Sequence, residues 1–275
     1  SELFKTFPVY FFNSKNLFTN ICNRNCSFCP GTKRTPKSMS LDEFKTVANA
    51  LIGVTDYIYF HVMGEPLTHP QLAHFVGIAT ERGFKSAITT NGTLLGKQQE
   101  MLLNAPALHK VNISLHAFEA NDLAVPFADY LRGCFEFGKA MEGKKLISYR
   151  LWNQGGADEL NGEILRKMEA AFPQPWAEER TGVRISSKTY VEHGDKFDWP
   201  DLSAPEGDGP LFCYGLRDQI GVLCDGTVVP CCLDHEGDLA LGNLYHEDLD
   251  TILESPRAKA IYQGFQQRKL GRKER

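Results

Sequence analysis

Three cysteines in one short stretch are the residues best suited to chemistry in this chain. The stretch Cys22-Asn-Arg-Asn-Cys26-Ser-Phe-Cys29 separates its thiols by three residues and then by two. Thiolates are the ligands of iron–sulfur clusters, and a loop with closely spaced cysteines can wrap one. A cube of four irons held by three cysteines keeps one iron without a protein ligand, which is typical of a reactive centre. A zinc knuckle, the competing interpretation, closes with a nearby fourth Cys or His, whereas the nearest histidine is His61.

The chain around these residues alternates strand and helix patterns. Apolar and β-branched runs predict strands at 16–21, 57–62, 86–90, 110–115, 145–152 and 182–186. Helical patterns lie between them at 40–52, 69–82, 97–105, 127–142 and 158–171. Ser40 and Glu43 form a capping-box pattern, and Gly83 is placed to end a helix. This alternation predicts an α/β fold with a mostly parallel sheet, whose chemistry gathers at the carboxyl ends of the strands.

Polar motifs follow several of the predicted strands at those ends. Gly64 lets the backbone approach a ligand, and Glu65 puts a carboxylate beside it. Arg150 carries a guanidinium fork that fits a carboxylate, although it could equally brace the barrel. The other polar residues at these ends are Thr90, Asn91, Ser114 and His116.

The cysteine spacing resembles the CxxxCxxC loop of the radical S-adenosylmethionine (SAM) superfamily, and Phe28 matches the aromatic residue usual before the last cysteine. The resemblance implies a [4Fe–4S] cluster on Cys22, Cys26 and Cys29, whose open iron takes the amino and carboxylate groups of SAM. It also implies a partial (β/α)6 TIM-like barrel, the radical SAM fold. An open iron site is oxygen-sensitive, so we expect an anaerobic or microaerobic host.

The same resemblance gives a role to the motif after residue 62. Gly64, Glu65 and Pro66 match the GGEP element of the family, with Met63 in place of the first glycine. The match implies that Glu65 hydrogen-bonds the amino group of SAM. The placement after a predicted strand makes this short motif informative, since the three residues alone are common in turns.

Other strand ends match the family less completely. Thr90 and Asn91 belong to a TNG turn, for which an ordinary strand-to-helix turn is an adequate alternative. Ser114 matches a serine that helps to bind SAM, and His116 stands where many members have Asp. We expect His116 to be structural rather than a contact of SAM or substrate. The resemblance leaves two roles open for Arg150: it could pair with the SAM carboxylate, or it could brace the barrel.

The last part of the chain holds half of its cysteines. Cys213 precedes a hairpin with the turn Asp225-Gly226, which returns the chain to Cys231. This interval resembles the SPASM or Twitch module and implies an auxiliary [4Fe–4S] cluster on Cys213 and Cys231. Cys224 and Cys232 are not at family ligand positions, although a divergent site could recruit one of them. The family closes the site with a later CxxC pair, which we expect beyond residue 270 or in a segment absent from this sequence.

These patterns divide the chain into three parts. Residues 1–190 are expected to form the radical SAM barrel, and residues 213–275 the auxiliary cluster module. Between them, 191–212 is rich in Gly, Pro and Asp and is expected to be a linker or a capping loop. We assign no catalytic residue, but the candidates for a base that accepts a substrate proton are Tyr190, Glu192, His193 and Asp195.

Composition limits the partners and the compartment. The net charge of −4 gives no general attraction to nucleic acid or to anionic membranes. No apolar run approaches the ~20 residues of a membrane helix, and the N-terminus is too polar for a signal peptide. Cysteine clusters without a secretory signal indicate a reducing cytosol, so we expect a cytoplasmic protein. The sequence begins with Ser1 rather than Met, so we expect it to be trimmed.

These features together predict an enzyme that cleaves SAM reductively and abstracts hydrogen from a substrate. We expect oxidation of a small polyol or aminocyclitol, as in Twitch-type dehydrogenases, with the help of the auxiliary cluster. The alternative is a radical SAM maturase that modifies a peptide or protein, although no leader-binding module fits before residue 16. A third interpretation, a non-catalytic electron-transfer protein, leaves the motifs at 64–66 and 90–92 unexplained. Either enzyme requires a flavodoxin- or ferredoxin-type electron donor.

Overall fold

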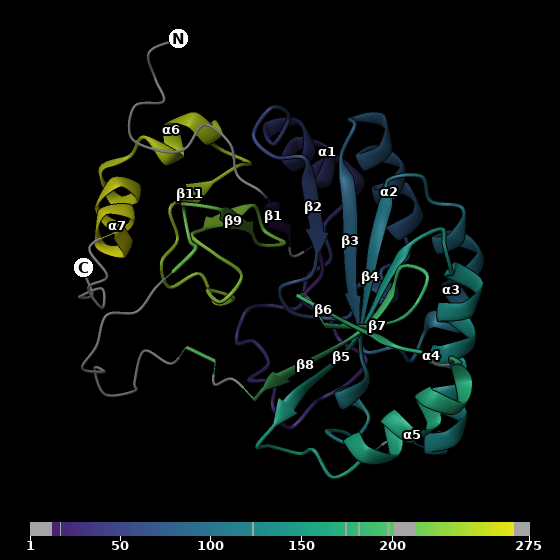
Figure 1. The fold of residues 1–275 in the computed structure, drawn as a ribbon. Coiled ribbons are helices and arrows are strands. Elements are labelled where there is room, and N and C mark those ends of the chain that lie inside the picture. The colour runs from purple at the N-terminus through teal and green to yellow at the C-terminus, as the bar shows by residue number, and fades with distance from the viewer. Residues whose placement is uncertain are drawn as a thin grey trace.

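A mostly parallel sheet forms the centre of the protein in the computed structural model (Figure 1). The structure describes residues 13–16, 18–122, 124–173, 175–180, 182–196, 199–200 and 213–266. Six of its strands, in sheet order, are β1 (Asn13–Asn16), β2 (Tyr57–Phe60), β3 (Lys85–Thr90), β4 (Leu108–Ser114), β5 (Leu146–Gln154) and β8 (Thr189–Asp195). Each pairs in parallel with the next. This arrangement confirms the predicted α/β fold with a partial (β/α)6 barrel.

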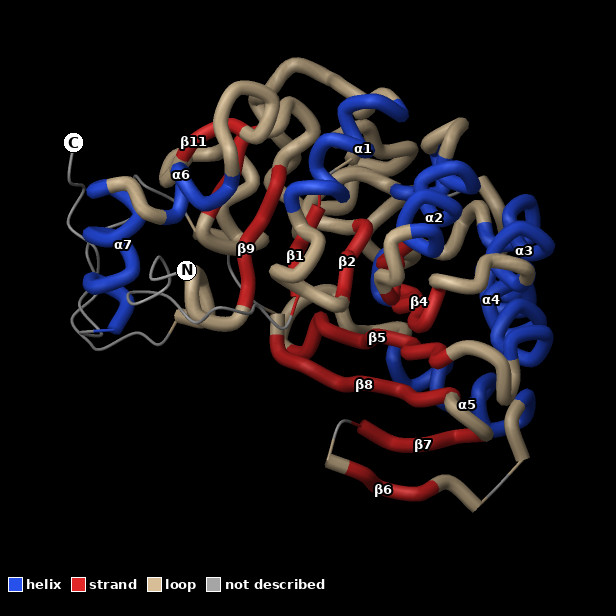
Figure 2. Tube along the Cα trace, turned by 90° about the horizontal axis from the view of Figure 1, so that it is seen from above, coloured by secondary structure: helices blue, strands red, loops and turns tan. Residues whose placement is uncertain are grey.

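Helices cover the outer face of this sheet, as Figure 2 shows from above. They are α1 (Leu41–Ala50), α2 (Leu72–Glu81), α3 (Leu95–Leu103), α4 (Phe127–Met141) and α5 (Asn161–Ala171). Ser40 caps α1 in the predicted capping box, and Gly83 follows α2 with a φ of 78°. Apolar residues recur on one face of each helix and are buried against the sheet. The ring of Phe44, for example, contacts those of Phe60 and Phe75.

The first strand begins earlier than the sequence predicts. The prediction was a strand at 16–21, whereas β1 ends at Asn16. Phe18 is buried against the rings of Phe60 and Phe75, and its carbonyl oxygen accepts a hydrogen bond from the Met39 N–H. The apolar side chain therefore marks core packing in an irregular segment. The strand itself consists of polar residues, so its pattern gives no strand signal.

The sixth parallel strand is β8, and the prediction of 182–186 for this place was wrong. Residues 182–186 form β7 (Gly182–Ser186), which is antiparallel to β8 and to β6 (Ala177–Glu179). Lys188, in the turn before β8, has a φ of 60°, where glycine or asparagine is usual, so the hairpin has no sequence signal. Residues 191–195, expected to begin a linker, belong to this strand. Residues 201–212 lie outside the described part of the chain.

The C-terminal part continues the same sheet. Its elements are β9 (Gln219–Val222), β10 (Thr227–Val229), β11 (Gly242–Asn243), α6 (Leu249–Leu253) and α7 (Pro256–Gln266). Strand β9 pairs in parallel with β1, and β10 returns antiparallel to β9 as the predicted hairpin. Gly226 makes the turn with a φ of 84°. The sheet is therefore shared by the barrel and the C-terminal part, which lie side by side in Figures 1 and 2.

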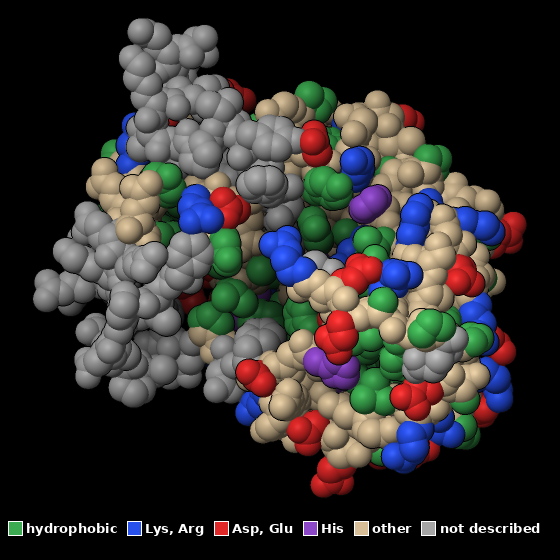
Figure 3. Space-filling view, in the orientation of Figure 1, with side chains coloured by type: hydrophobic (Ala, Val, Ile, Leu, Met, Phe, Trp, Pro, Cys, Tyr) green, Lys and Arg blue, Asp and Glu red, His purple; other side chains and the backbone are tan. Residues whose placement is uncertain are grey.

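The surface mixes charges of both signs. On the face seen in Figure 3, Lys and Arg side chains are interspersed with Asp and Glu. Interspersed charges of this kind produce no large field of one sign on that face. Among the described residues, none of the helices combines the length and the apolar character that spanning a membrane requires.

Candidate active site and iron–sulfur centres

The cysteine loop follows β1 at the carboxyl end of the parallel strands. Cys22 is exposed, Cys26 and Cys29 are half-buried, and all three are free thiols. A turn closes the loop, in which the Cys29 N–H donates to the Cys26 carbonyl oxygen at 2.9 Å. Burial raises the pKa of the Cys22 thiol, and the nearby charges of Glu65 and the other two cysteines raise it further. The three sulfurs therefore share one region of the barrel mouth.

One side of the loop is fastened to the turn after β3. Asn91 Nδ2 donates to Asn23 Oδ1 at 2.9 Å, and Asn23 Nδ2 donates to Thr93 Oγ1 at 3.0 Å. Asn91 is itself fixed, because its Oδ1 accepts the Thr93 N–H at 3.0 Å. The turn that contains Thr90 and Asn91 therefore holds the cysteine loop as well as joining β3 to α3.

The opposite side of the loop lies on the segment after β4. Ser27 N–H donates to the Ala120 carbonyl oxygen at 3.0 Å, and Asn25 N–H donates to Asn121 Oδ1 at 3.1 Å. The same side chain places its Nδ2 3.0 Å from Cys26 Sγ. Sequence reasoning does not identify Asn121, because a single asparagine downstream of a strand belongs to no motif.

Glu65 is buried after the end of β2, with 1% of its surface exposed. Its Oε1 accepts the Leu67 N–H at 3.0 Å and the Thr90 hydroxyl at 2.7 Å. Its Oε2 accepts the Asn91 N–H at 2.7 Å. Burial raises the pKa of this carboxyl to about 7, although the three hydrogen bonds act in the opposite direction. Glu65 thus joins the ends of β2 and β3, and its contact with the SAM amino group stays a prediction.

Gly64 is required by the close approach of two backbones. Its φ is 79°, and a Cβ there would lie 2.5 Å from the Thr19 carbonyl oxygen and 2.9 Å from that of Ile21. The next residue fixes this approach, because Glu65 N–H donates to the Ile21 carbonyl oxygen at 3.0 Å. Pro66 then opens a 3₁₀ turn. The Gly-Glu-Pro element therefore anchors the segment that leads into the cysteine loop.

His116 braces the wall beside the loop. The centre of its ring lies 5.0 Å from that of Phe28, and its Nδ1 lies 3.0 Å from the Arg150 carbonyl oxygen. Burial lowers the pKa of His116, so the imidazole is neutral at neutral pH. Ser114, at the end of β4, is half-buried and lies opposite Arg150 in the strand register. The contacts of His116 favour the structural role that we expected for it.

A group of charges crosses from β4 to β8 on one face of the sheet. Glu192 is paired with Lys110 at 3.1 Å and with Arg150 at 3.4 Å. Burial alone would raise the pKa of Glu192, but the Ser148 hydroxyl and the two cations bring it below its ordinary value. The Arg150 guanidinium also lies 4.1 Å from the centre of a ring of Trp152. Because protein groups already hold Arg150, the geometry favours bracing of the barrel over contact with the SAM carboxylate.

The four candidate bases divide between the two faces of β8. Side chains alternate along a strand, so Tyr190 lies on the same face as Glu192, which meets Lys110 and Arg150. His193 and Asp195 lie on the other face and are exposed. Of the four, Glu192 is held ionised by its two cations.

The structure brings Cys213 and Cys231 together. The thiols of Cys213 and Cys231 are close enough to interact, and the Cys213 sulfur accepts the Gly215 N–H at 3.3 Å. The interaction of the two thiols lowers the pKa of Cys213, and the same interaction, together with burial, raises the pKa of Cys231. A Cβ at Gly215 would lie 2.9 Å from the Phe265 ring and 3.2 Å from Cys213 Sγ. The two sulfurs therefore face one another in a closely packed site.

The other two cysteines of this part have apolar surroundings. Cys224 is 2% exposed and packs in an apolar cluster with Met63, and burial raises its pKa to about 11. Cys232 is half-buried against the same cluster. Met63 Sδ lies 4.0 Å from Cys29 Sγ, so the cluster extends to the first cysteine loop. Met63, which departs from the family motif, thus packs between the loop and the C-terminal part.

The donor sets fit iron–sulfur clusters. All the donors are free thiols, which are the usual ligands of such clusters. In the described ranges no group of three or more His, Cys, Asp or Glu side chains is close enough to hold one metal ion. A cube spreads its ligands over separate irons, so thiols set apart along a loop suit its corners. Cys22, Cys26 and Cys29 would hold a cube with one iron open, and Cys213 and Cys231 would supply two ligands of a second.

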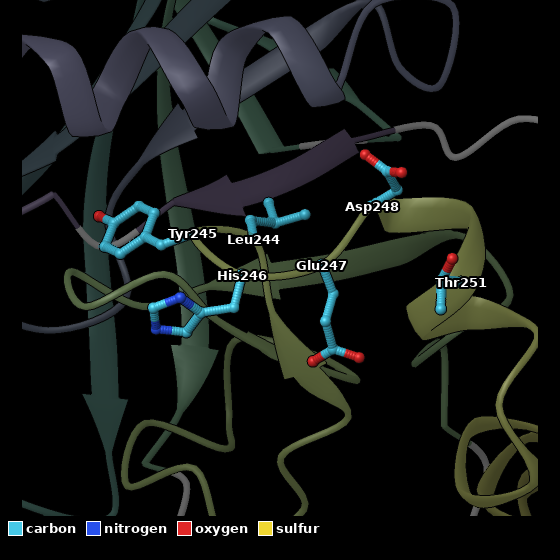
Figure 4. A pocket seen from close by; sticks show the side chains of 6 residues that line it. All are labelled: Leu244, Tyr245, His246, Glu247, Asp248 and Thr251. Carbon is cyan, nitrogen blue, oxygen red and sulfur yellow. The ribbon is translucent and has the colours of Figure 1, made fainter.

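The C-terminal part also has a depression in its surface (Figure 4). It contains about 700 Å³, open solvent included, and is lined by Leu244, Tyr245, His246, Glu247, Asp248 and Thr251. His246 and Glu247 extend to one side of the backbone, whereas Asp248 extends to the other. None of the cysteines or strand-end motifs lines it.

Comparison with protein families agrees with this geometry. Residues 16–142 match the radical SAM superfamily, and residues 213–274 match the SPASM iron–sulfur cluster-binding domain. The chain belongs to the radical SAM superfamily and carries a C-terminal SPASM module. The first domain implies a [4Fe–4S] cluster and SAM, and the second implies auxiliary iron–sulfur clusters.

Curated relatives share parts of this chain. Fe-coproporphyrin III synthase of Methanosarcina barkeri is 25% identical over 203 residues, which are 72% of this chain and 48% of that protein. The SAM-dependent 2-deoxy-scyllo-inosamine dehydrogenase of Niallia circulans is 31% identical over 103 residues, which are 35% of this chain and 41% of that protein. The matched segments span between 29% and 59% of the length of these curated relatives.

Solved structures share the fold. BtrN in complex with AdoMet and 2-DOIA has a TM-score of 0.58 at 20% identity, over 93% of this chain and 87% of that one. SuiB of Streptococcus suis, bound to the precursor peptide SuiA, has a TM-score of 0.66 at 14% identity, over 93% of this chain and 67% of that one. At these identities the likeness concerns the fold alone.

Proposed function

We propose that this protein is an enzyme that cleaves SAM reductively and abstracts hydrogen from a substrate. The proposal depends on one observation. The loop of Cys22, Cys26 and Cys29 lies beside the buried Glu65, at the carboxyl end of the parallel strands. A [4Fe–4S] cluster with an open iron, when bound there, supplies the electron that splits SAM into methionine and a 5′-deoxyadenosyl radical. The protein binds, orients and excludes water around this chemistry.

The residues around the loop have distinct tasks in this proposal. Asn23 fixes the loop to the turn after β3. Glu65, oriented by Thr90 and Asn91, offers a carboxylate to the amino group of SAM. Ser114 adds a hydroxyl at the end of β4. His116 and Arg150 brace the wall of the site, as their contacts favour.

A small polar substrate, such as a polyol or an aminocyclitol, is our first choice. The face of the sheet that carries Lys110, Arg150 and Glu192 is polar and charged, and the buried side chain of Asn112 lies near it in the register. Asn112 Oδ1 has no hydrogen-bond partner among the described atoms. Such an atom favours a ligand with hydroxyl or amino groups. A dehydrogenase of an aminocyclitol among the relatives supports this choice. We propose an oxidation assisted by an auxiliary cluster at Cys213 and Cys231.

A peptide or protein substrate is the second candidate. The structure of SuiB bound to a precursor peptide has a higher TM-score, 0.66, than the 0.58 of BtrN. In either case we expect a flavodoxin- or ferredoxin-type donor to supply the electron. Deuterium transfer separates the candidates, because 5′-deoxyadenosine gains deuterium only from a substrate whose C–H bond is broken.

The test of the proposal is SAM cleavage by the reconstituted protein with dithionite. Changing Cys22, Cys26 and Cys29 to Ala together should abolish formation of 5′-deoxyadenosine. Cys134→Ala is the matched control, because Cys134 is buried in the helix–sheet core and should not hold iron. Undiminished 5′-deoxyadenosine in the triple variant would refute the proposal.

Iron content of the full-length protein, with the closing cysteine pair that we expect outside this sequence, tests the second cluster. Two cubes give about eight irons per chain and one gives about four. Changing Cys213 and Cys231 to Ala should lower the count from eight to four and leave SAM cleavage possible. A count of four that this double variant does not change would remove the support for an oxidation assisted by an auxiliary cluster.

A further inference from the structure

Asn121 makes a contact that the proposed function does not use. Its Nδ2 lies 3.0 Å from Cys26 Sγ, which is within hydrogen-bond distance and short for an amide N–H that donates to sulfur. The residue follows β4, whereas the sulfur belongs to the loop after β1. The contact therefore joins two strand ends that are far apart in the sequence.

The partners of Asn121 settle which end of its amide faces the sulfur. Oδ1 accepts the Asn25 N–H at 3.1 Å, and only an oxygen can accept there. Nδ2 lies 2.6 Å from the Ala117 carbonyl oxygen, which requires a donor. The amide therefore presents an N–H group to Cys26.

The backbone around Asn121 is fixed in place. Its own N–H donates to the Phe118 carbonyl oxygen at 3.1 Å, and the carbonyl of Ala120 accepts the Ser27 N–H at 3.0 Å. Asn121 is also half-buried, which limits competition from water. A donor held in this way needs no rearrangement when the charge on the sulfur changes.

We propose that Asn121 is a positioning residue that sets the reduction potential of the cluster held by the cysteine loop. The inference rests on the proposed function, since it takes Cys26 as a ligand. Hydrogen bonds to ligand sulfurs are one of the features that set the potential of an iron–sulfur cluster. One-electron reduction adds negative charge that is shared with the sulfurs, and an N–H donor stabilises that charge. The Asn121 amide therefore raises the potential and makes reduction by the external donor easier.

The experiment is a redox titration of the reconstituted full chain, with dithionite as the reductant and EPR of the reduced cluster as the readout. The signal that changes when SAM is added identifies the cluster with the open iron. Asn121→Ala removes the donor. Asn23→Ala is the matched control, because it removes an asparagine anchor of the same loop that touches no sulfur in the described contacts. We expect a more negative potential in Asn121→Ala at unchanged iron content, and an unchanged potential in Asn23→Ala.

Two results would overturn the proposal: an unchanged potential in Asn121→Ala, or an equal shift in Asn121→Ala and Asn23→Ala. If Asn121→Ala holds no iron, the same titration is carried out with Asn121→Leu, which keeps the side-chain volume. Loss of the cluster in both variants would also overturn the proposal, because the residue would then serve assembly. A failure of the proposed function would give a different result, because the wild-type chain and the triple cysteine variant would then hold the same amount of iron.

Discussion

Glu65 is a carboxyl group in a place that disfavours its charge. Burial raises its pKa from an ordinary 4.5 to about 7, in spite of three hydrogen bonds from the protein. The unfolded chain loses this proton near pH 4.5, whereas the folded chain keeps it until about pH 7. The folded state therefore binds more protons between these values, and its stability falls as the pH rises through them.

Glu65→Gln should remove this pH dependence. A shift from 4.5 to about 7 corresponds to about 3 kcal/mol of unfolding free energy, lost by the wild type between pH 4.5 and pH 7. Urea unfolding of the wild type and the variant at about pH 5 and about pH 8 measures the difference. Glu163→Gln, on the surface of α5, is the control and should keep the wild-type slope. Equal slopes in the wild type and Glu65→Gln would contradict the burial argument.

A comparison of Gly64 with Gly53 distinguishes the energetic cost of a positive φ from the cost of a steric clash. Both have a positive φ, 79° and 75°, but a Cβ at Gly64 meets two carbonyl oxygens whereas one at Gly53 meets nothing within 4 Å. Gly53→Ala should cost about 1–2 kcal/mol of unfolding free energy from φ alone. Gly64→Ala should cost more and should lower the iron content, because it displaces the segment that enters the cysteine loop. Equal losses in the two variants, with iron retained, would show that the close approach at Gly64 is unimportant.

The residues of the site differ in how far the sequence predicts their contacts. The spacing of Cys22, Cys26 and Cys29 is local, so the sequence alone can predict the loop that they form. The contact of Asn121 with this loop depends on the register of β4 against β1, which no local pattern records. Arg150 is an intermediate case: its position at a strand end is predictable, but its partner Glu192 lies on a strand that was assigned in part to a linker.

At the scale of the elements, strands with buried apolar runs are the ones that the sequence predicts. The predictions at 57–62, 86–90, 110–115 and 145–152 overlap β2, β3, β4 and β5 closely. The sequence does not predict strand β8, because its turn has Lys188 instead of a glycine and because the strand itself contains Glu, His, Gly and Asp. The sequence does not predict strand β1, because this strand is polar and short. Both segments become strands because they pair with neighbouring strands, and this pairing is a tertiary effect that the local sequence does not record.

The charges that join β8 to the barrel give a prediction for this strand. The pKa of Glu192 is lowered below 4.5, so its ion pairs stabilise the fold above that pH and are lost as the pH falls through the folded value. Glu192→Gln should cost about 2–3 kcal/mol at neutral pH, because it leaves Lys110 and Arg150 without their partner. Urea unfolding at about pH 7 and about pH 3 tests this, since the cost should shrink at the lower pH.

The control for Glu192 is an exposed ion pair of the same kind. Glu163→Gln breaks the pair with Lys167 on α5, in which both side chains are about 40% exposed. It should cost about 0.5 kcal/mol or less at either pH. If Glu192→Gln behaved like Glu163→Gln, the group of charges would not hold β8 to the sheet.

At the scale of the whole molecule, the two iron–sulfur parts are joined by backbone and by side chains. Residues 13–16 of β1 pair with 219–222 of β9, so one sheet runs through both parts. The sequence predicts a separate C-terminal module, but it contains no signal for this parallel pair. Met63 adds a second connection, because it packs between Cys29 and the apolar cluster around Cys224. A shared sheet and core predict that the two parts unfold together.

Arg34 provides the side-chain connection that tests this coupling. It reaches from the segment after the cysteine loop to the carboxylate of Asp225, and its Nη1 donates to the Glu236 carbonyl oxygen at 2.8 Å. Arg34→Ala should lower the unfolding free energy by about 1–2 kcal/mol, because a half-buried ion pair and a hydrogen bond are lost. Arg132→Ala, which breaks an exposed pair with Asp129 on α4, should cost less than about 0.5 kcal/mol. Urea unfolding followed by circular dichroism and by tryptophan fluorescence should give one coincident transition in the wild type and in both variants. Two separate transitions in the wild type, or equal costs for the two arginines, would mean that the parts are stable independently of this connection.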